Sequence, residues 1–254
     1  MTHVTRILIL GGTAEAAVLA RRLADRPALH VTTSLAGRTR RPATLPGHVR
    51  IGGFGGVPGL TDYLRSERIT VLIDATHPFA THMPFHARDA AARLGTPLLR
   101  LERPAWRPKP GDRWTTVPDL ETAAGAIPAG ARVFLTTGRQ DLAPFAVRDD
   151  AFFLIRSIEP PDVGRFRRQA VILGRGPFTV ANETALLRRH AIDLLVTKNS
   201  GAEATAAKLE AARRLGLPVV MVERPPRPQV ATAAQVDDAL AWMDRMASPA
   251  GTSP

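Results

Sequence analysis

The chain has 254 residues, of which 44% are hydrophobic, so it can form one large α/β domain or two smaller ones. It contains no cysteine, which excludes disulfides, thiolate metal sites and a cysteine nucleophile. Its formal net charge of +11 favours an anionic partner, and the alternatives are a nucleic acid, a membrane surface and a polycarboxylate substrate. Aromatic residues make up only 5% of the chain and the basic residues are scattered, and both facts argue against a nucleic-acid partner.

The N-terminal segment lacks the charged and apolar regions of a secretory signal. No apolar run in the sequence reaches the length of a membrane span. We therefore expect a cytoplasmic protein without a membrane partner.

Residues 7–10 are four consecutive apolar residues and predict a strand that is buried on both faces, as in a parallel sheet. Gly11 and Gly12 end this strand in a turn, and Thr13 can cap the helix that follows. A glycine turn before a helix N-terminus is an anion site, for which the phosphate of a nucleotide cofactor is the expected ligand. The complete G-x-G-x-x-G pattern is absent, and a tight turn without a ligand remains the alternative.

A second strand is predicted over residues 29–33. In a Rossmann unit an acidic residue near its end binds the ribose 2′-hydroxyl, but here Thr-Thr-Ser stands at 32–34, followed by Arg38, Arg40 and Arg41. Arginines in place of a carboxylate favour a 2′-phosphate and hence NADP over NAD. The alternative is a solvated basic loop.

A short strand at 49–51 enters the glycine-rich stretch 52–56, which predicts either a close approach of the backbone to a ligand or a flexible turn.

The next strand, 71–74, ends in polar Thr76 and His77. Open α/β sheets bind ligands at this edge, and the proline after His77 keeps that residue out of the following helix. His82 and His86 share one helix face, but no further ligands flank them, so we expect no metal site.

A proline-rich stretch follows the fifth predicted strand, 97–101, and indicates a linker. We expect an N-terminal cofactor-binding domain at 1–103, a second α/β domain at 113–246 and a disordered tail at 247–254.

The second half repeats the pattern of strands that end in polar loops. Strands are predicted at 132–135, 152–156, 171–173, 193–196 and 218–222. The loop 197–201 places an ammonium, an amide and a hydroxyl in sequence, a set that can bind a carboxylate or a phosphate, although a solvent-exposed loop is the alternative. Two α/β halves of this kind predict two domains with a ligand cleft between them.

Six motifs occur in order along the chain: GGTAE at 11–15, IGGFGG at 51–56, DATHPFA at 74–80, LTTGRQDL at 135–142, GRGPFTVANE at 174–183 and LLVTKNSG at 194–201. In these motifs the chain resembles the precorrin-6A reductase and cobalt-precorrin-6A reductase family of cobalamin biosynthesis. The resemblance runs from about residue 6 to 225, and DATHPFA and LVTKNSG are its most specific parts. One departure is Ala202-Glu203-Ala204, where the family often has another glycine.

The resemblance implies two Rossmann-like domains that bind NADPH and reduce one double bond of a ring-contracted tetrapyrrole rich in carboxylates. The residues that it places at the cofactor are Gly11, Gly12, Thr13, Glu15, Ser34, Arg38, Gly53, Thr76, His77 and Pro78. Those that it places at the substrate are Thr137, Gly138, Arg139, Arg175, Lys198, Asn199, Ser200 and Gly201. His77 and Lys198 are the candidates for a catalytic proton donor or electrostatic stabiliser, with solvent as the alternative donor.

Other functions remain open at this point. The first is another NADP-dependent reductase that acts on a smaller anionic substrate, and the second is a basic nucleic-acid-binding protein. The motifs do not distinguish a metal-free from a cobalt-containing tetrapyrrole, and they do not indicate an oligomeric state.

Overall fold

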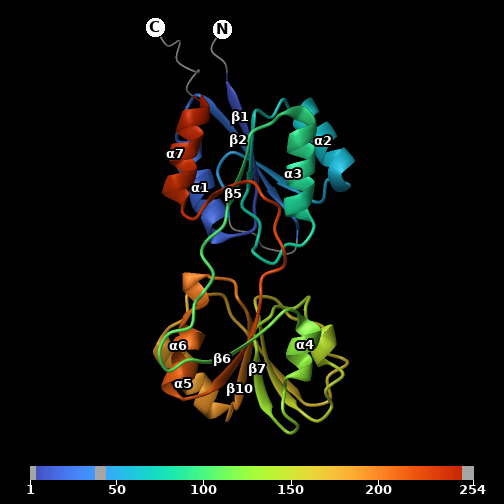
Figure 1. Cartoon of the computed structure of the whole chain (residues 1–254), viewed down its shortest axis with the longest axis vertical. Helices are drawn as coiled ribbons and strands as arrows, with labels where there is room; N and C mark the ends of the chain where they lie inside the picture. The colour runs from blue at the N-terminus through green and yellow to red at the C-terminus, as the bar shows by residue number, and fades with distance from the viewer. Residues whose placement is uncertain (1–3, 38–43, 248–254) are drawn as a thin grey trace. The chain divides into compact units, whose positions relative to one another are not determined.

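The computed structural model describes residues 4–37 and 44–247 and divides the chain into two compact units. The first unit consists of residues 1–104 and 225–254, and the second of residues 105–224 (Figure 1). The chain therefore leaves the first unit once, builds the second and returns.

The first unit is a six-stranded parallel sheet with the strand order β3-β2-β1-β4-β5-β12. Its strands are β1 (Thr5–Leu10), β2 (Leu29–Leu35), β3 (His48–Ile51), β4 (Val71–Asp74), β5 (Leu98–Leu101) and β12 (Ala231–Ala233). Its helices are α1 (Ala14–Ala24), α2 (Gly56–Ser66), α3 (Met83–Leu94) and α7 (Val236–Ala247). This is the order 3-2-1-4-5-6 of a Rossmann sheet, with β12 as the sixth strand.

The alternation of side chains along β1 explains why helices cover both faces of this sheet. Ile7 and Ile9 pack in a cluster with α1 and α7, whereas Leu8 and Leu10 pack in a second cluster with α2 and α3 (Figure 1). The four residues are at most 2% exposed. The predicted strand buried on both faces is thus confirmed.

The second unit is also a six-stranded parallel sheet, with the order β9-β8-β7-β10-β11-β6. Its strands are β6 (Arg113–Val117), β7 (Arg132–Leu135), β8 (Phe152–Ser157), β9 (Gln169–Leu173), β10 (Leu194–Lys198) and β11 (Pro218–Val222). Its helices are α4 (Leu120–Gly125), α5 (Val180–Arg189) and α6 (Ala207–Arg214), with the short 3₁₀ turns η1 (Ala143–Phe145) and η2 (Glu203–Thr205). Counted from β7, this order repeats that of the first sheet, so that β10 corresponds to β4.

The prediction of two α/β units with parallel sheets is confirmed, but the predicted second domain, 113–246, extends too far. Residues from 225 onward belong to the first unit, because β12 pairs with β5 and residues of α7 such as Leu240 and Met243 join the core around α1. The predicted tail lies, from residue 248 on, outside the described residues.

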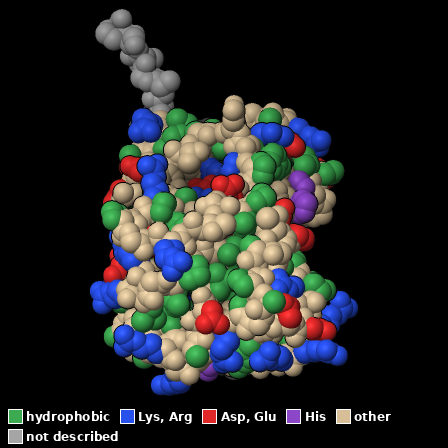
Figure 2. All heavy atoms as spheres, turned by 60° about the horizontal axis from the view of Figure 1, so that its bottom comes forward, with side chains coloured by type: hydrophobic (Ala, Val, Ile, Leu, Met, Phe, Trp, Pro, Cys, Tyr) green, Lys and Arg blue, Asp and Glu red, His purple; other side chains and the backbone are tan. Residues whose placement is uncertain are grey.

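None of the helices in residues 4–37 and 44–247 is long and apolar enough to cross a membrane. Over the face drawn in Figure 2, Lys and Arg side chains are spread among hydrophobic and acidic side chains.

Candidate functional site

The turn between β1 and α1 contains the predicted phosphate-binding residues Gly12 and Thr13. Thr13 is the N-cap of α1, and its Oγ1 accepts from the amide of Ala16 at 3.2 Å. Gly12 has a φ of +124°, a region that L side chains rarely adopt, and a Cβ at this position would meet no atom within 4 Å. The space in front of the helix N-terminus is therefore open to a ligand, and the predicted cap is confirmed.

Gly11 packs closely against the neighbouring strand β2. A Cβ at Gly11 would lie 3.1 Å from Cγ2 of Thr33 and 3.2 Å from Cδ2 of Leu35, and its amide donates to the carbonyl of Ser34 at 2.8 Å. The absence of a side chain at Gly11 thus lets β1 lie close to β2.

A hydrogen bond joins the glycine turn to the loop after β4. The hydroxyl of Thr13 donates to the carbonyl of Ala75 at 2.9 Å. The predicted phosphate turn and the predicted Thr76–Pro78 segment are therefore neighbours in the first unit. Glu15, in the first turn of α1, instead pairs with Arg103 at 2.6 Å.

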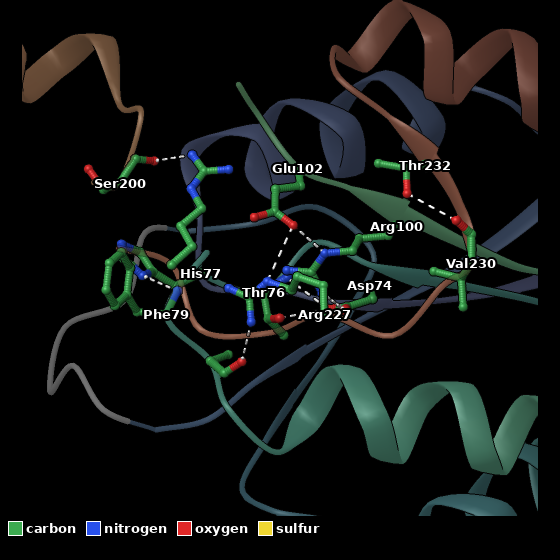
Figure 3. Close-up of polar contacts among 12 residues, drawn as sticks. Asp74, Thr76, His77, Phe79, Arg100, Glu102, Ser200, Arg227, Val230 and Thr232 are labelled. Carbon is green, nitrogen blue, oxygen red and sulfur yellow. Dashed lines mark hydrogen bonds and ion pairs between the residues drawn. The ribbon is translucent and has the colours of Figure 1, made fainter. Parts of the chain in front are cut away.

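The loop after β4 is held by a buried carboxylate (Figure 3). Asp74 is 2% exposed, and its Oδ1 accepts from the amide of Thr76 at 3.1 Å and from the hydroxyl of Thr76 at 2.6 Å. Its other oxygen accepts from Nη1 of Arg100 at 2.5 Å, and Arg100 also pairs with Glu102. This buried cluster fixes the backbone that precedes His77.

The ring of His77 is oriented by its own loop. Its Nδ1 accepts from the amide of Phe79 at 3.2 Å. Since an accepting nitrogen carries no proton, a neutral His77 ring has its proton on Nε2, which can donate to a ligand.

Arg50 is a cation that the sequence analysis did not assign to the site. It donates to Oγ of Ser34 at 3.1 Å and to the carbonyls of Gly52 at 2.7 Å and Gly53 at 2.5 Å. It thereby ties the glycine-rich stretch to the end of β2, where the ribose is expected. Arg38, which the sequence predicts at the same place, lies outside the described residues, as do Arg40 and Arg41.

In the second unit the predicted basic residues differ in their contacts. Lys198, at the end of β10, pairs with Asp141 at 2.5 Å, and Arg139 pairs with Glu159 at 3.2 Å. Arg175 is exposed and makes no ion pair or hydrogen bond within the described part of the chain. Asp141 lies in the same loop as the predicted residues Thr137 and Gly138, and the hydroxyl of Thr137 donates to the carbonyl of Asp141 at 3.4 Å. The ion pair of Asp141 therefore brings this loop to Lys198.

The loop 197–201 is used in part by the fold itself. The Oδ1 of Asn199 accepts from the amide of Trp106 at 2.7 Å, and its Nδ2 donates to the carbonyl of Trp106 at 3.0 Å. The predicted donation from Asn199 to an anion would have to replace these bonds. Ser200 accepts from the amide of Ala202 at 3.5 Å, and Gly201 has a φ of +71°.

A buried lysine lies next to this loop. Lys208, in α6, is 4% exposed, donates to the carbonyl of Thr205 at 3.1 Å and lies 5.0 Å from the ring of Trp106. Burial, as the largest cause, and the charge of Arg156 lower its pKa, Glu183 raises it, and together they bring it to about 7. Arg156 and Glu183 form a buried pair at 2.6 Å.

The described residues include no group of three or more His, Asp or Glu side chains that could hold a metal ion. His82 and His86 lie with their ring centroids 6.3 Å apart.

The Rossmann strand order, the capped glycine turn and the polar loops at strand ends are typical of nucleotide-dependent α/β enzymes. The chain belongs to the family described as precorrin-6x reductase CbiJ/CobK, whose model matches residues 6–244. A protein of Rhodococcus erythropolis named precorrin-6A reductase is 52% identical over 94% of this chain and 97% of its own length.

Two further comparisons agree with this membership. A solved structure named CobK precorrin-6A reductase superimposes with a TM-score of 0.90 at 45% identity, over 95% of this chain and 97% of its own. A cobalt-precorrin-6A reductase of Priestia megaterium is 31% identical, over 86% of this chain and 90% of its own.

Proposed function

We propose that the chain uses NADPH to reduce one double bond of precorrin-6A. Family membership supports a reductase, and reductases of this kind need a reduced nicotinamide cofactor. The observation that carries the proposal is the bond from Thr13 to Ala75, because it joins an open anion site to the loop of His77.

The cofactor fits the residues of the first unit. The pyrophosphate would bind at Gly12 and the N-terminus of α1, where a Cβ would meet no protein atom. Ser34, Gly53 and Arg38 would lie toward the ribose and its 2′-phosphate. The guanidinium of Arg50 lies beside Ser34. A positive charge at this place supports NADPH over NADH, because only NADPH carries a 2′-phosphate.

The cofactor would supply a hydride, and the residues of the loop after β4 would orient its nicotinamide ring. Thr76 and Pro78 would contact the ring. The Nε2–H of His77 would donate a hydrogen bond or a proton toward the carbon next to the one that accepts the hydride.

The tetrapyrrole carboxylates would be bound by the second unit. Arg175 could bind a carboxylate without breaking an ion pair to any residue that the structure describes, whereas Lys198 and Arg139 would exchange Asp141 and Glu159 for substrate. Thr137, Gly138, Ser200 and Gly201 would provide polar contacts. Asn199 would act by holding Trp106 in place.

The relatives reported above favour a metal-free substrate, since the protein at 52% identity is named for precorrin-6A and the one at 31% for cobalt-precorrin-6A.

The proposal is tested by anaerobic incubation of the purified chain with precorrin-6A, following the nicotinamide absorbance and the tetrapyrrole spectrum together. We expect equal amounts of NADPH and precorrin-6A to be consumed, with slower turnover on NADH and on cobalt-precorrin-6A. Faster turnover on NADH, or no turnover of either tetrapyrrole, would contradict the proposal.

A further inference from the structure

The segment through which the chain returns from the second unit to the first carries two arginines. Its sequence is Glu223-Arg224-Pro225-Pro226-Arg227-Pro228. Arg224 is the last residue of the second unit, and Arg227 lies in the part that belongs to the first. We refer to residues 224–228 as the connector.

Arg224 holds the loop that follows Lys198. Its Nε donates to the carbonyl of Asn199 at 2.9 Å, and its Nη2 donates to the carbonyl of Ser200 at 3.2 Å. Two carbonyls of the predicted substrate loop are thereby fixed by one guanidinium group, whose planar fork suits paired acceptors.

Arg227 holds the loop that carries His77. Its Nη1 donates to the carbonyl of Ala80 at 3.1 Å, and its Nε lies 3.6 Å from a carboxylate oxygen of Glu102 (Figure 3). Glu102 pairs with Arg100, and Arg100 pairs with Asp74, which binds Thr76. The loop is therefore held at one end by Asp74 and at the other by Arg227.

The backbone of the connector is suited to this task. Three of its five residues are proline, which fixes φ. Proline thereby reduces the number of backbone conformations of the unfolded connector, so less entropy is lost when the arginines are placed. Pro228 is buried, so the segment is also anchored by packing.

We propose that the connector is a positioning element for the reduction, in which Arg227 fixes the His77 loop and Arg224 fixes the loop after Lys198. The inference rests on the proposed function, which assigns the cofactor to the first of these loops and the tetrapyrrole to the second. Neither arginine needs to touch a ligand. A connector that only stabilised the fold would change both ligands' constants together, whereas two separate loop contacts predict separate effects.

The test compares Arg224→Gln and Arg227→Gln with the wild-type chain. Arg227→Gln should lower kcat about tenfold, the order of one charge-assisted hydrogen bond, with the KM for the tetrapyrrole unchanged. Arg224→Gln should raise the KM for the tetrapyrrole about tenfold, with the KM for NADPH unchanged. Arg224→Lys and Arg227→Lys should each restore part of the loss, because lysine can still donate to one carbonyl.

The control is Arg22→Gln, which removes an exposed ion pair to Asp237, a residue that like Arg227 lies in the C-terminal part of the first unit. Arg22 pairs with Asp237 at 2.9 Å, and both side chains are more than half exposed. This variant should leave every constant unchanged.

Hydrogen exchange of the chain without ligands separates this inference from the proposed function. Exchange should increase at residues 75–80 in Arg227→Gln and at residues 199–202 in Arg224→Gln, and at neither in the control. If the wild-type chain shows no reductase activity but these local increases occur, the proposed function fails and the loop contacts stand. Unchanged exchange in folded variants, or equal changes in both ligands' constants, would overturn the inference.

Discussion

The loops after β4 and β10 occupy corresponding positions in two sheets of the same strand order, yet they are held in different ways. The first is fixed by the Asp74–Arg100 pair, in which both side chains are 3% exposed. The second begins with the Lys198–Asp141 pair, in which the side chains are 14% and 32% exposed. A fully buried pair cannot be exchanged for a ligand without leaving a buried charge unpaired, whereas a partly exposed pair can, because water reaches it. The comparison indicates a rigid loop in the first unit and an exchangeable cation in the second.

The largest effect is expected for the buried pair. Asp74→Asn leaves the buried guanidinium of Arg100 with less counter-charge and should lower the free energy of unfolding of the first unit by about 3–5 kcal/mol. Hydrogen exchange of the β1 and β4 amides measures this. The control Asp62→Asn breaks an exposed pair with Arg65 and should cost under about 0.5 kcal/mol. Equal effects of the two changes would contradict the rigid-loop account.

The second unit should respond to pH through Lys208. Its pKa of about 7 in the folded chain lies below its ordinary value of 10.5, so between these values the unfolded chain binds a proton that the folded chain does not. The free energy of unfolding should therefore rise with pH across this window, by up to about 1.4 kcal/mol per pH unit from this group. Lys208→Met should remove that rise in the exchange of the β10 amides, and Lys109→Met, at an exposed lysine, should not. If the free energy of unfolding still rises with pH in Lys208→Met, other groups cause the rise.

The glycine turn can be tested apart from the packing of the sheet. Gly12→Ala should destabilise the first unit by about 1–2 kcal/mol because of its positive φ, and it should weaken NADPH binding at least tenfold because the methyl group enters open ligand space. Gly95→Ala, also at a positive φ with no atom near the added Cβ, should cost similar stability without affecting NADPH. Titration calorimetry with NADPH distinguishes the two, and equal affinities would show that the turn does not bind the cofactor.

The smallest effects concern the exchangeable pair, and they should have opposite signs. Lys198→Ala should raise the KM for the tetrapyrrole about tenfold, through the loss of one charged contact. Asp141→Asn should lower it severalfold, because no protein carboxylate then competes for Lys198. If Asp141→Asn raises the KM instead, Asp141 positions Lys198 and the pair is not exchanged.

Local signals in the sequence were sufficient to predict much of the fold. The strands predicted at 71–74, 132–135 and 218–222 have those bounds in the structure. The strands β6 and β12 were missed because edge strands carry few buried residues, and the sequence ATA of β12 has no apolar run. Without β12, the return of the chain to the first unit could not be foreseen.

The site was predicted less completely, because its contacts join residues that lie far apart in the sequence. Asp74 meets Arg100 across 26 positions, Lys198 meets Asp141 across 57, and Asn199 meets Trp106 across 93. One signal was present, for Arg100 is a charged residue inside the apolar strand LLRL, and a charge in such a strand needs a buried partner.

Whether the chain transfers a hydride from NADPH to precorrin-6A can be followed with an isotope label. The chain is incubated anaerobically with precorrin-6A and NADPH that carries deuterium at C4, and the tetrapyrrole product is examined by mass spectrometry. We expect a product that gains a single deuterium from the cofactor, in step with NADPH oxidation. A reduced product without deuterium, formed from fully labelled cofactor, would contradict this expectation.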